Sequence, residues 1–179
     1  MAQTPAGNLG FLTVVHEPSG YLGGYLVTNS WGRPLEFRLS TAVQPNRVQQ
    51  ILYGGTLQPY ICADLIGKTL VAKTTTAVKL LFTDREAVLE LRLGVEVPVL
   101  WIADFEDPLA RVMAAAGSEV LPANKARGPI LTHPLFRGDV ALVRRSVEAL
   151  DQAIDLAEPF ARIREAIGEA RKMGVTNRA

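Results

Sequence analysis

Apolar and polar residues alternate along the first forty residues in the way that β-strands require. Residues 35–39 show the pattern most clearly, because three apolar side chains there alternate with polar or charged ones. Two further apolar runs, at 11–15 and 21–28, are bounded by short stretches rich in Gly, Pro, Ser and Asn. These turn residues predict hairpins, so we expect an antiparallel meander whose third strand lies near an edge.

Between residues 45 and 72 the apolar positions recur at spacings of three and four, which predicts a helix pair or one bent helix. Gly54 and Gly55 interrupt the pattern. Pro45 suits a first helical turn, and Thr56 is placed to cap a second helix.

Two nearly continuous apolar runs follow, at 77–83 and 95–103, with a short helical pattern between them. Strands that read this way are covered on both faces, and a right-handed crossover makes two such strands parallel. We therefore expect both strands to be central in the sheet and to be neighbours or near neighbours. Asp107 before Pro108 predicts the start of a helix that ends at Gly117.

The last third of the chain divides into an irregular segment and two amphipathic segments. Residues 122–137 contain three prolines and no clear period, which indicates a long loop or a strap. Apolar stripes then run through 140–156 and 160–173, as in helices that pack on a core. We predict an α/β core domain at 1–121, the loop or strap at 122–137, and a helical C-terminal extension at 138–176 packed on the same domain.

Composition narrows the classes of function. The 179 residues carry 19 Lys and Arg against 18 Asp and Glu, so the formal charge is +1 and gives no support for a nucleic-acid partner. Cys62 is the single cysteine, which excludes an internal disulfide and fits a reducing cytoplasm. The sequence suggests neither a signal peptide nor a membrane span. We expect a cytoplasmic protein of bacterial type.

The run Phe82-Thr-Asp84 closes the fourth predicted strand. Three antiparallel strands, a long helix, this strand, a short helix and another buried strand form an order that resembles the ribonuclease-H-like superfold over residues 10–107. The fold class is thus α/β, with a mixed sheet, parallel strand-helix-strand units after the meander, and the helical extension. A profilin-like or longin-like sandwich is the rival topology, which suits two doubly covered strands less well.

The resemblance implies acidic residues at the first, fourth and fifth strands that hold divalent metal for phosphoryl transfer. Asp84 matches the fourth-strand position, Asp104 matches the fifth, and Glu17 is the carboxylate at the exit of the first. The early helix presents no carboxylate before Asp64, which departs from the pattern.

Each aspartate also has a structural interpretation. Thr83-Asp-Arg-Glu86 reads as a capping box, in which Thr83 accepts from the Glu86 amide and Asp84 starts a helix. Asp104 is harder to explain in this way, since Asp107 already serves as a cap. It is therefore the carboxylate that we expect to face a ligand.

Trp31 and Arg33 lie at the predicted tip of the second hairpin. Exposed Trp and Arg are favoured anchors at interfaces, so these residues are a candidate interaction surface. The alternative is that Trp31 folds back onto the sheet.

The sequence thus leaves two hypotheses. The first is a non-catalytic module that binds a protein or another ligand, needs no cofactor and has a protein partner of unknown identity. The second is a metal-dependent nuclease or phosphoryl-transfer enzyme that uses Asp84 and Asp104, with Glu17, to bind Mg²⁺ or Mn²⁺. Convergence of these three carboxylates would favour the second hypothesis.

Overall fold

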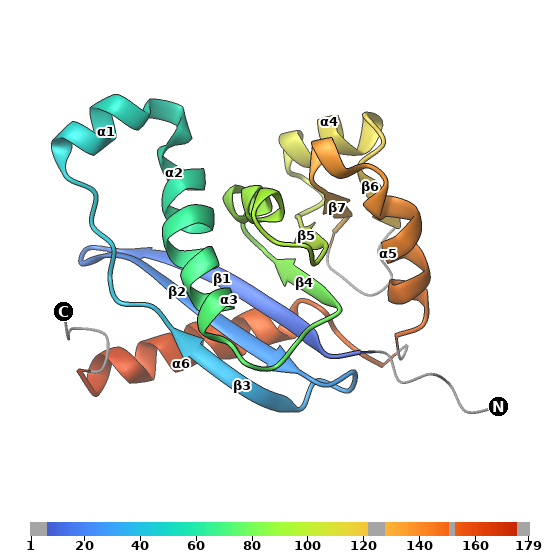
Figure 1. Cartoon of the computed structure of the whole chain (residues 1–179), viewed down its shortest axis with the longest axis horizontal. Coiled ribbons are helices and arrows are strands. Elements are labelled where there is room, and N and C mark those ends of the chain that lie inside the picture. The colour runs from blue at the N-terminus through green and yellow to red at the C-terminus, as the bar shows by residue number, and fades with distance from the viewer. Residues whose placement is uncertain (1–6, 122–127, 151–152, 175–179) are drawn as a thin grey trace.

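A single mixed sheet of seven strands forms the centre of the molecule (Figure 1). The computed structural model describes residues 7–121, 128–150 and 153–174. The strand order is β3-β2-β1-β4-β5-β7-β6. The strands are β1 (Leu9–Glu17), β2 (Gly20–Thr28), β3 (Pro34–Leu39), β4 (Leu80–Thr83), β5 (Val99–Ile102), β6 (Glu119–Leu121) and β7 (Ile130–Thr132).

The pairing of the first five strands confirms the predicted ribonuclease-H-like order. β1, β2 and β3 form the antiparallel meander, with β3 at the edge of the sheet. β4 lies parallel to both β1 and β5, so the two strands with continuous apolar runs are adjacent and internal. Their C-terminal ends therefore meet at one edge of the sheet, where the following loops gather.

Helices cover both faces of the sheet (Figure 1). One group comprises α1 (Arg47–Tyr53), the 3₁₀ turn η1 (Gly54–Thr56), α2 (Leu57–Pro59), η2 (Tyr60–Gly67), α3 (Lys68–Lys73) and the 3₁₀ helix η3 (Glu86–Leu93). The others are α4 (Pro108–Ala115), the 3₁₀ turn η4 (Pro134–Phe136), α5 (Asp139–Glu148) and α6 (Glu158–Lys172). None of the helices in these described ranges is both long and apolar enough to cross a membrane.

The helical run from α1 to α3 bends at the two glycines, as predicted, but its caps differ. Asn46 caps α1 through a capping box with Gln49, so Pro45 lies outside the helix. Thr56 donates its hydroxyl to the Tyr53 carbonyl and caps nothing. η2 is a π-helix, a rare form that the spacing of apolar residues did not predict.

Each face of the sheet carries its own apolar core. On one face, η2, α3 and η3 cover side chains such as Leu12, Leu81 and Trp101. On the other, α5 and α6 cover Phe11, Phe82 and their neighbours. Both cores follow from the alternation along the strands, because successive side chains point to opposite faces.

The segment predicted as a loop or strap at 122–137 contains a strand. β7 pairs antiparallel with β5 through Leu100↔Thr132 to Ile102↔Ile130, and it also pairs with β6. Three residues between prolines are too few to reveal a period of two, so only the tertiary pairing identifies this strand.

Candidate functional site

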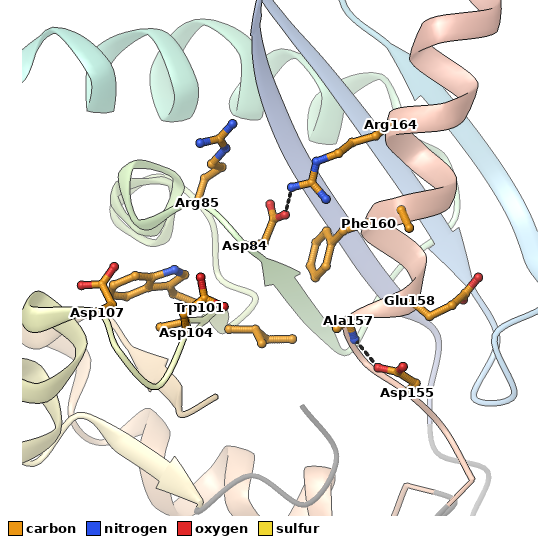
Figure 2. A pocket seen from close by; sticks show the side chains of 13 residues that line it. Asp84, Arg85, Trp101, Asp104, Asp107, Asp155, Ala157, Glu158, Phe160 and Arg164 are labelled. Atoms are coloured by element: carbon orange, nitrogen blue, oxygen red, sulfur yellow. Dashed lines mark hydrogen bonds and ion pairs between the residues drawn. The ribbon is translucent and has the colours of Figure 1, made fainter. Parts of the chain in front are cut away.

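The C-terminal ends of β4 and β5 open into a cleft of about 550 Å³ (Figure 2). The loop after β5 forms one wall, and the first half of α6 forms the other. Its carboxylates are Asp84, Asp104, Asp107, Asp155 and Glu158, its guanidinium groups are those of Arg85 and Arg164, and its aromatic side chains are Trp101 and Phe160.

Asp84 is held by partners from two distant elements. Leu12 pairs with Thr83 in the parallel ladder, so the next residue on β1, Thr13, lies beside Asp84. The Thr13 hydroxyl donates to Asp84 Oδ1 at 2.6 Å. Arg164 of α6 forms an ion pair with the other oxygen, Oδ2. Both carboxylate oxygens are therefore engaged, one by a hydroxyl and one by a cation.

The predicted capping box at Thr83 is wrong. Thr83 Oγ1 accepts from the Arg85 amide at 3.1 Å, and η3 begins at Glu86 without a side-chain cap. Asp84 therefore does not start the helix, because its carboxylate turns toward Thr13 and Arg164 instead. The box motif is local, whereas the partners of Asp84 come from β1 and α6.

The loop after β5, Asp104-Phe-Glu-Asp107, carries three carboxylates and one aromatic side chain. The Asp107 amide donates to the Asp104 carbonyl at 3.1 Å, which closes a turn that leaves Asp104 and Phe105 exposed. Asp107 caps α4 by accepting from the amides of Leu109 and Ala110, as predicted. Asp104 faces the cleft, and 59% of Phe105 is exposed beside it.

A second cavity of about 360 Å³ adjoins the cleft and shares Asp84, Arg85, Trp101 and Asp107 with it. Arg85 Nε donates to the Val14 carbonyl at 2.9 Å, which fixes the side chain across β1. Burial raises the pKa of the Cys62 thiol, in the wall of this cavity, to about 11. The thiol is thus protonated at neutral pH and is a poor nucleophile.

Negative charge dominates this region. Burial raises the pKa of Glu86, and the nearby carboxylates of Glu90 and Asp107 raise it further. Like charges that are crowded at a partly buried site disfavour the ionised form, so the cavities favour a cationic ligand.

Trp101 lies between the two cavities and is 97% buried, since only 3% of its surface is exposed. Its indole N–H donates to no acceptor within the part of the chain that the structure describes. Figure 2 shows the nitrogen on the side of the ring that faces Asp84. The nitrogen itself is not a buried atom without a partner, so the N–H is open to the cavities and can donate to water or to a ligand.

Glu17 does not join the other two predicted carboxylates. It lies four residues beyond Thr13 on β1, about 13 Å away at the usual rise of ~3.3 Å per residue. It forms an ion pair with Arg171 near the C-terminal end of α6. The structure thus brings Asp84 and Asp104 to one cleft and leaves Glu17 outside it.

Trp31 projects from the tip of the β2–β3 hairpin with 79% of its surface exposed, so it does not fold back onto the sheet. Asn29 holds the tip by accepting from the amides of Trp31 and Arg33. Arg162 of α6 donates to the Gly32 carbonyl and ties the tip to the helix. Arg33 is exposed as well, and an interaction role for this pair stays a prediction.

The donor set does not fit a divalent metal ion. Among the described residues there is no group of three or more His, Cys, Asp or Glu side chains that could hold one. Asp84 is engaged by a guanidinium, whereas hard cations need several free oxygen ligands.

Sequence reasoning missed Trp101, Asp155 and Arg164 in the cleft, and Thr13, whose hydroxyl holds Asp84. Arg164 lay in a mixed basic and acidic helix face that is typical of solvated surface. Trp101 lies in an apolar run, which predicted a buried strand and no binding role.

No protein-family model matches the chain, and no curated protein matches it. The chain is similar in structure to endonuclease V of Ciona intestinalis, in a variant bound to a 23mer DNA containing an inosine followed by a ribo-adenosine. That match has 11% identity and a TM-score of 0.45 and covers 93% of this chain and 86% of the other. A second structure of endonuclease V from this organism, with a 24mer DNA of the same kind, has 11% identity, a TM-score of 0.44 and coverage of 91% and 86%.

Proposed function

We propose that this protein is a non-catalytic binding module whose ligand occupies the cleft at the C-terminal ends of β4 and β5. The observation that carries the proposal is the engagement of Asp84 by Thr13 and Arg164. A guanidinium paired with the fourth-strand carboxylate supplies the positive charge that a metal would otherwise bring. The C-terminal edge of the sheet is still open to a ligand, while Arg164 of the same chain neutralises the Asp84 carboxylate.

The cleft has the properties of a ligand site. Its volume lies within the range of roughly 300–1,000 Å³ that is usual for such sites. Trp101 and Phe160 supply apolar surface, and charged groups of both signs surround them. Ligands of open α/β sheets bind at this edge, outside the carboxyl ends of the strands.

The alternative is a metal-dependent nuclease or phosphoryl-transfer enzyme, which is favoured by the placement of Asp84 and Asp104 after adjacent parallel strands. Titration calorimetry with manganese chloride separates the two. We expect no binding heat at millimolar metal and no cleavage of DNA or RNA in its presence. Manganese binding that is lost in both Asp84→Asn and Asp104→Asn, together with cleavage, would make the protein an enzyme.

Arg171→Gln is the matched control for Arg164→Gln, because each removes one ion pair made by α6. Only Arg164→Gln releases the Asp84 carboxylate. We therefore expect Arg164→Gln to bind manganese more tightly than the native protein or Arg171→Gln does. Equal manganese affinity in all three proteins would contradict the role given to Arg164.

A further inference from the structure

Building on the proposed function, we infer that the cleft binds a basic, amphipathic peptide segment of a partner protein. Three features favour this ligand: the net charge of the cleft, the N–H donor of Trp101 and the exposed Phe105 next to the lining residue Asp104. The charge argues against an anionic ligand, and the donor argues against a ligand without an acceptor.

The charge of the cleft favours a cationic ligand. Five carboxylates line it against two guanidinium groups, which leaves a formal charge of −3. Arg164 neutralises Asp84, and Glu158 has a partner in Arg162. No basic side chain in the described ranges forms an ion pair with Asp104 or Asp155. These two carboxylates are therefore available to Lys or Arg side chains, and the field repels a phosphate backbone.

Trp101 favours a ligand that also accepts a hydrogen bond. Its indole is 97% buried against the cleft, and its N–H has no acceptor among the described residues. A bare metal ion or a polyamine offers no acceptor to this donor. A peptide does, because every residue carries a backbone carbonyl beside its side chain.

Two exposed apolar side chains lie close in sequence to the lining residues Asp104 and Asp107. Phe105 lies in the turn between Asp104 and Asp107, and 59% of its surface is exposed. Leu109, on the first turn of α4, is 44% exposed. Aromatic side chains bordered by acidic ones suit a segment in which basic and apolar residues alternate on one face.

The test uses a fluorescein-labelled lysine–leucine peptide with helical spacing and measures anisotropy as protein is added. The glutamate–leucine counterpart and a single-stranded DNA are the comparison probes. We expect saturable binding of the lysine peptide alone, weakened by added salt because charges carry the recognition. Preference for the DNA or for the glutamate peptide would overturn the inference.

Matched variants locate the site. Asp104→Asn combined with Asp155→Asn should weaken binding roughly tenfold by removing two rim charges. Glu96→Gln combined with Glu148→Gln removes the same charge from exposed positions outside the cleft and should leave affinity unchanged. Equal losses in the two double variants would mean non-specific attraction and would also overturn the inference.

Trp101 itself reports on occupancy. The chain has two tryptophans, so Trp31→Phe leaves Trp101 as the single reporter. We expect the lysine peptide to shift Trp101 emission in that variant with unchanged affinity. Loss of binding on Trp31→Phe would place the site at the hairpin tip instead. If neither the peptide nor manganese binds, the peptide inference is wrong and the proposed function is not contradicted. If manganese binds and nucleic acid is cleaved, the proposed function is wrong.

Discussion

Glu36 fastens β3 to the loop that follows α3. Its carboxylate accepts from the backbone amides of Thr75 and Thr76, the latter at 2.9 Å, and from the Arg38 guanidinium. These bonds to the charged form lower the pKa of the carboxyl from about 4.5 to about 2, with the Thr76 amide as the largest cause. The anion is therefore better accommodated in the folded chain than in the unfolded one.

Glu36→Gln should consequently destabilise the protein in a pH-dependent way. A carboxyl whose pKa is depressed on folding adds stability above its unfolded pKa, and this stability is lost as the pH falls through the folded value. Thermal melts of the native protein and the variant should differ most above about pH 5 and converge as the pH falls from about 4.5 toward 2. A difference that stays constant over this range would show that charge is not involved.

Single residues were predictable from sequence only where their partners are local. Asp107 caps the helix that begins one residue later, and the motif contains all that is needed. Asp84 bonds to Thr13 and Arg164, which lie 71 and 80 residues away, so no local motif includes them. Asp104 lines the cleft, and a ligand-binding role for it stays a prediction that rests on its position after a recognised strand.

At the scale of elements, two adjacent glycines set how closely helices approach β2. A Cβ atom on Gly23 would overlap with Ile66 of η2, and one on Gly24 would overlap with Ile163 of α6. Because neighbouring residues of a strand face opposite sides, the pair lets one helix approach each face of the sheet.

Gly24→Ala should therefore cost about 1–3 kcal/mol, the usual cost of overpacking a core. The methyl group would push Ile163 and α6 away from the sheet. Gly55→Ala is the control, since a Cβ there meets no atom within 4 Å and the free energy of unfolding should change by less than about 0.5 kcal/mol. Urea unfolding measures both, and equal effects would contradict tight packing at β2.

Elements were predictable in proportion to their length and periodicity. β4 and β5 were found because doubly buried strands are apolar throughout. β7 was missed, since three residues show no period and its identity depends on pairing with β5. The π-helical hydrogen bonding of η2 was missed as well, because apolar spacing does not distinguish it from an α-helix over eight residues.

At the scale of the whole molecule, the C-terminal third completes one of the two cores. Phe160, Ile163 and Ile167 of α6 are each at most 2% exposed and pack over β1 and β2. α5 adds Val143 and Val147 to the same core and also forms the ion pair of Asp139 with Arg92 of η3 at 2.8 Å. The two apolar stripes in the sequence predicted that these helices exist. They did not predict which face of the sheet each helix covers.

Ending the chain after Arg137 should give an aggregating product. The shortened protein would expose Phe11, Phe82 and the rest of that face, and apolar patches of such extent drive association. It would also leave Arg92 without Asp139. Size-exclusion chromatography with light scattering measures the outcome, and a chain ended after Gly174, which keeps all of α6, is the control and should behave as the full chain does. A shortened chain that stayed monomeric and melted like the control would mean that α5 and α6 form an arm whose packing adds nothing to the fold.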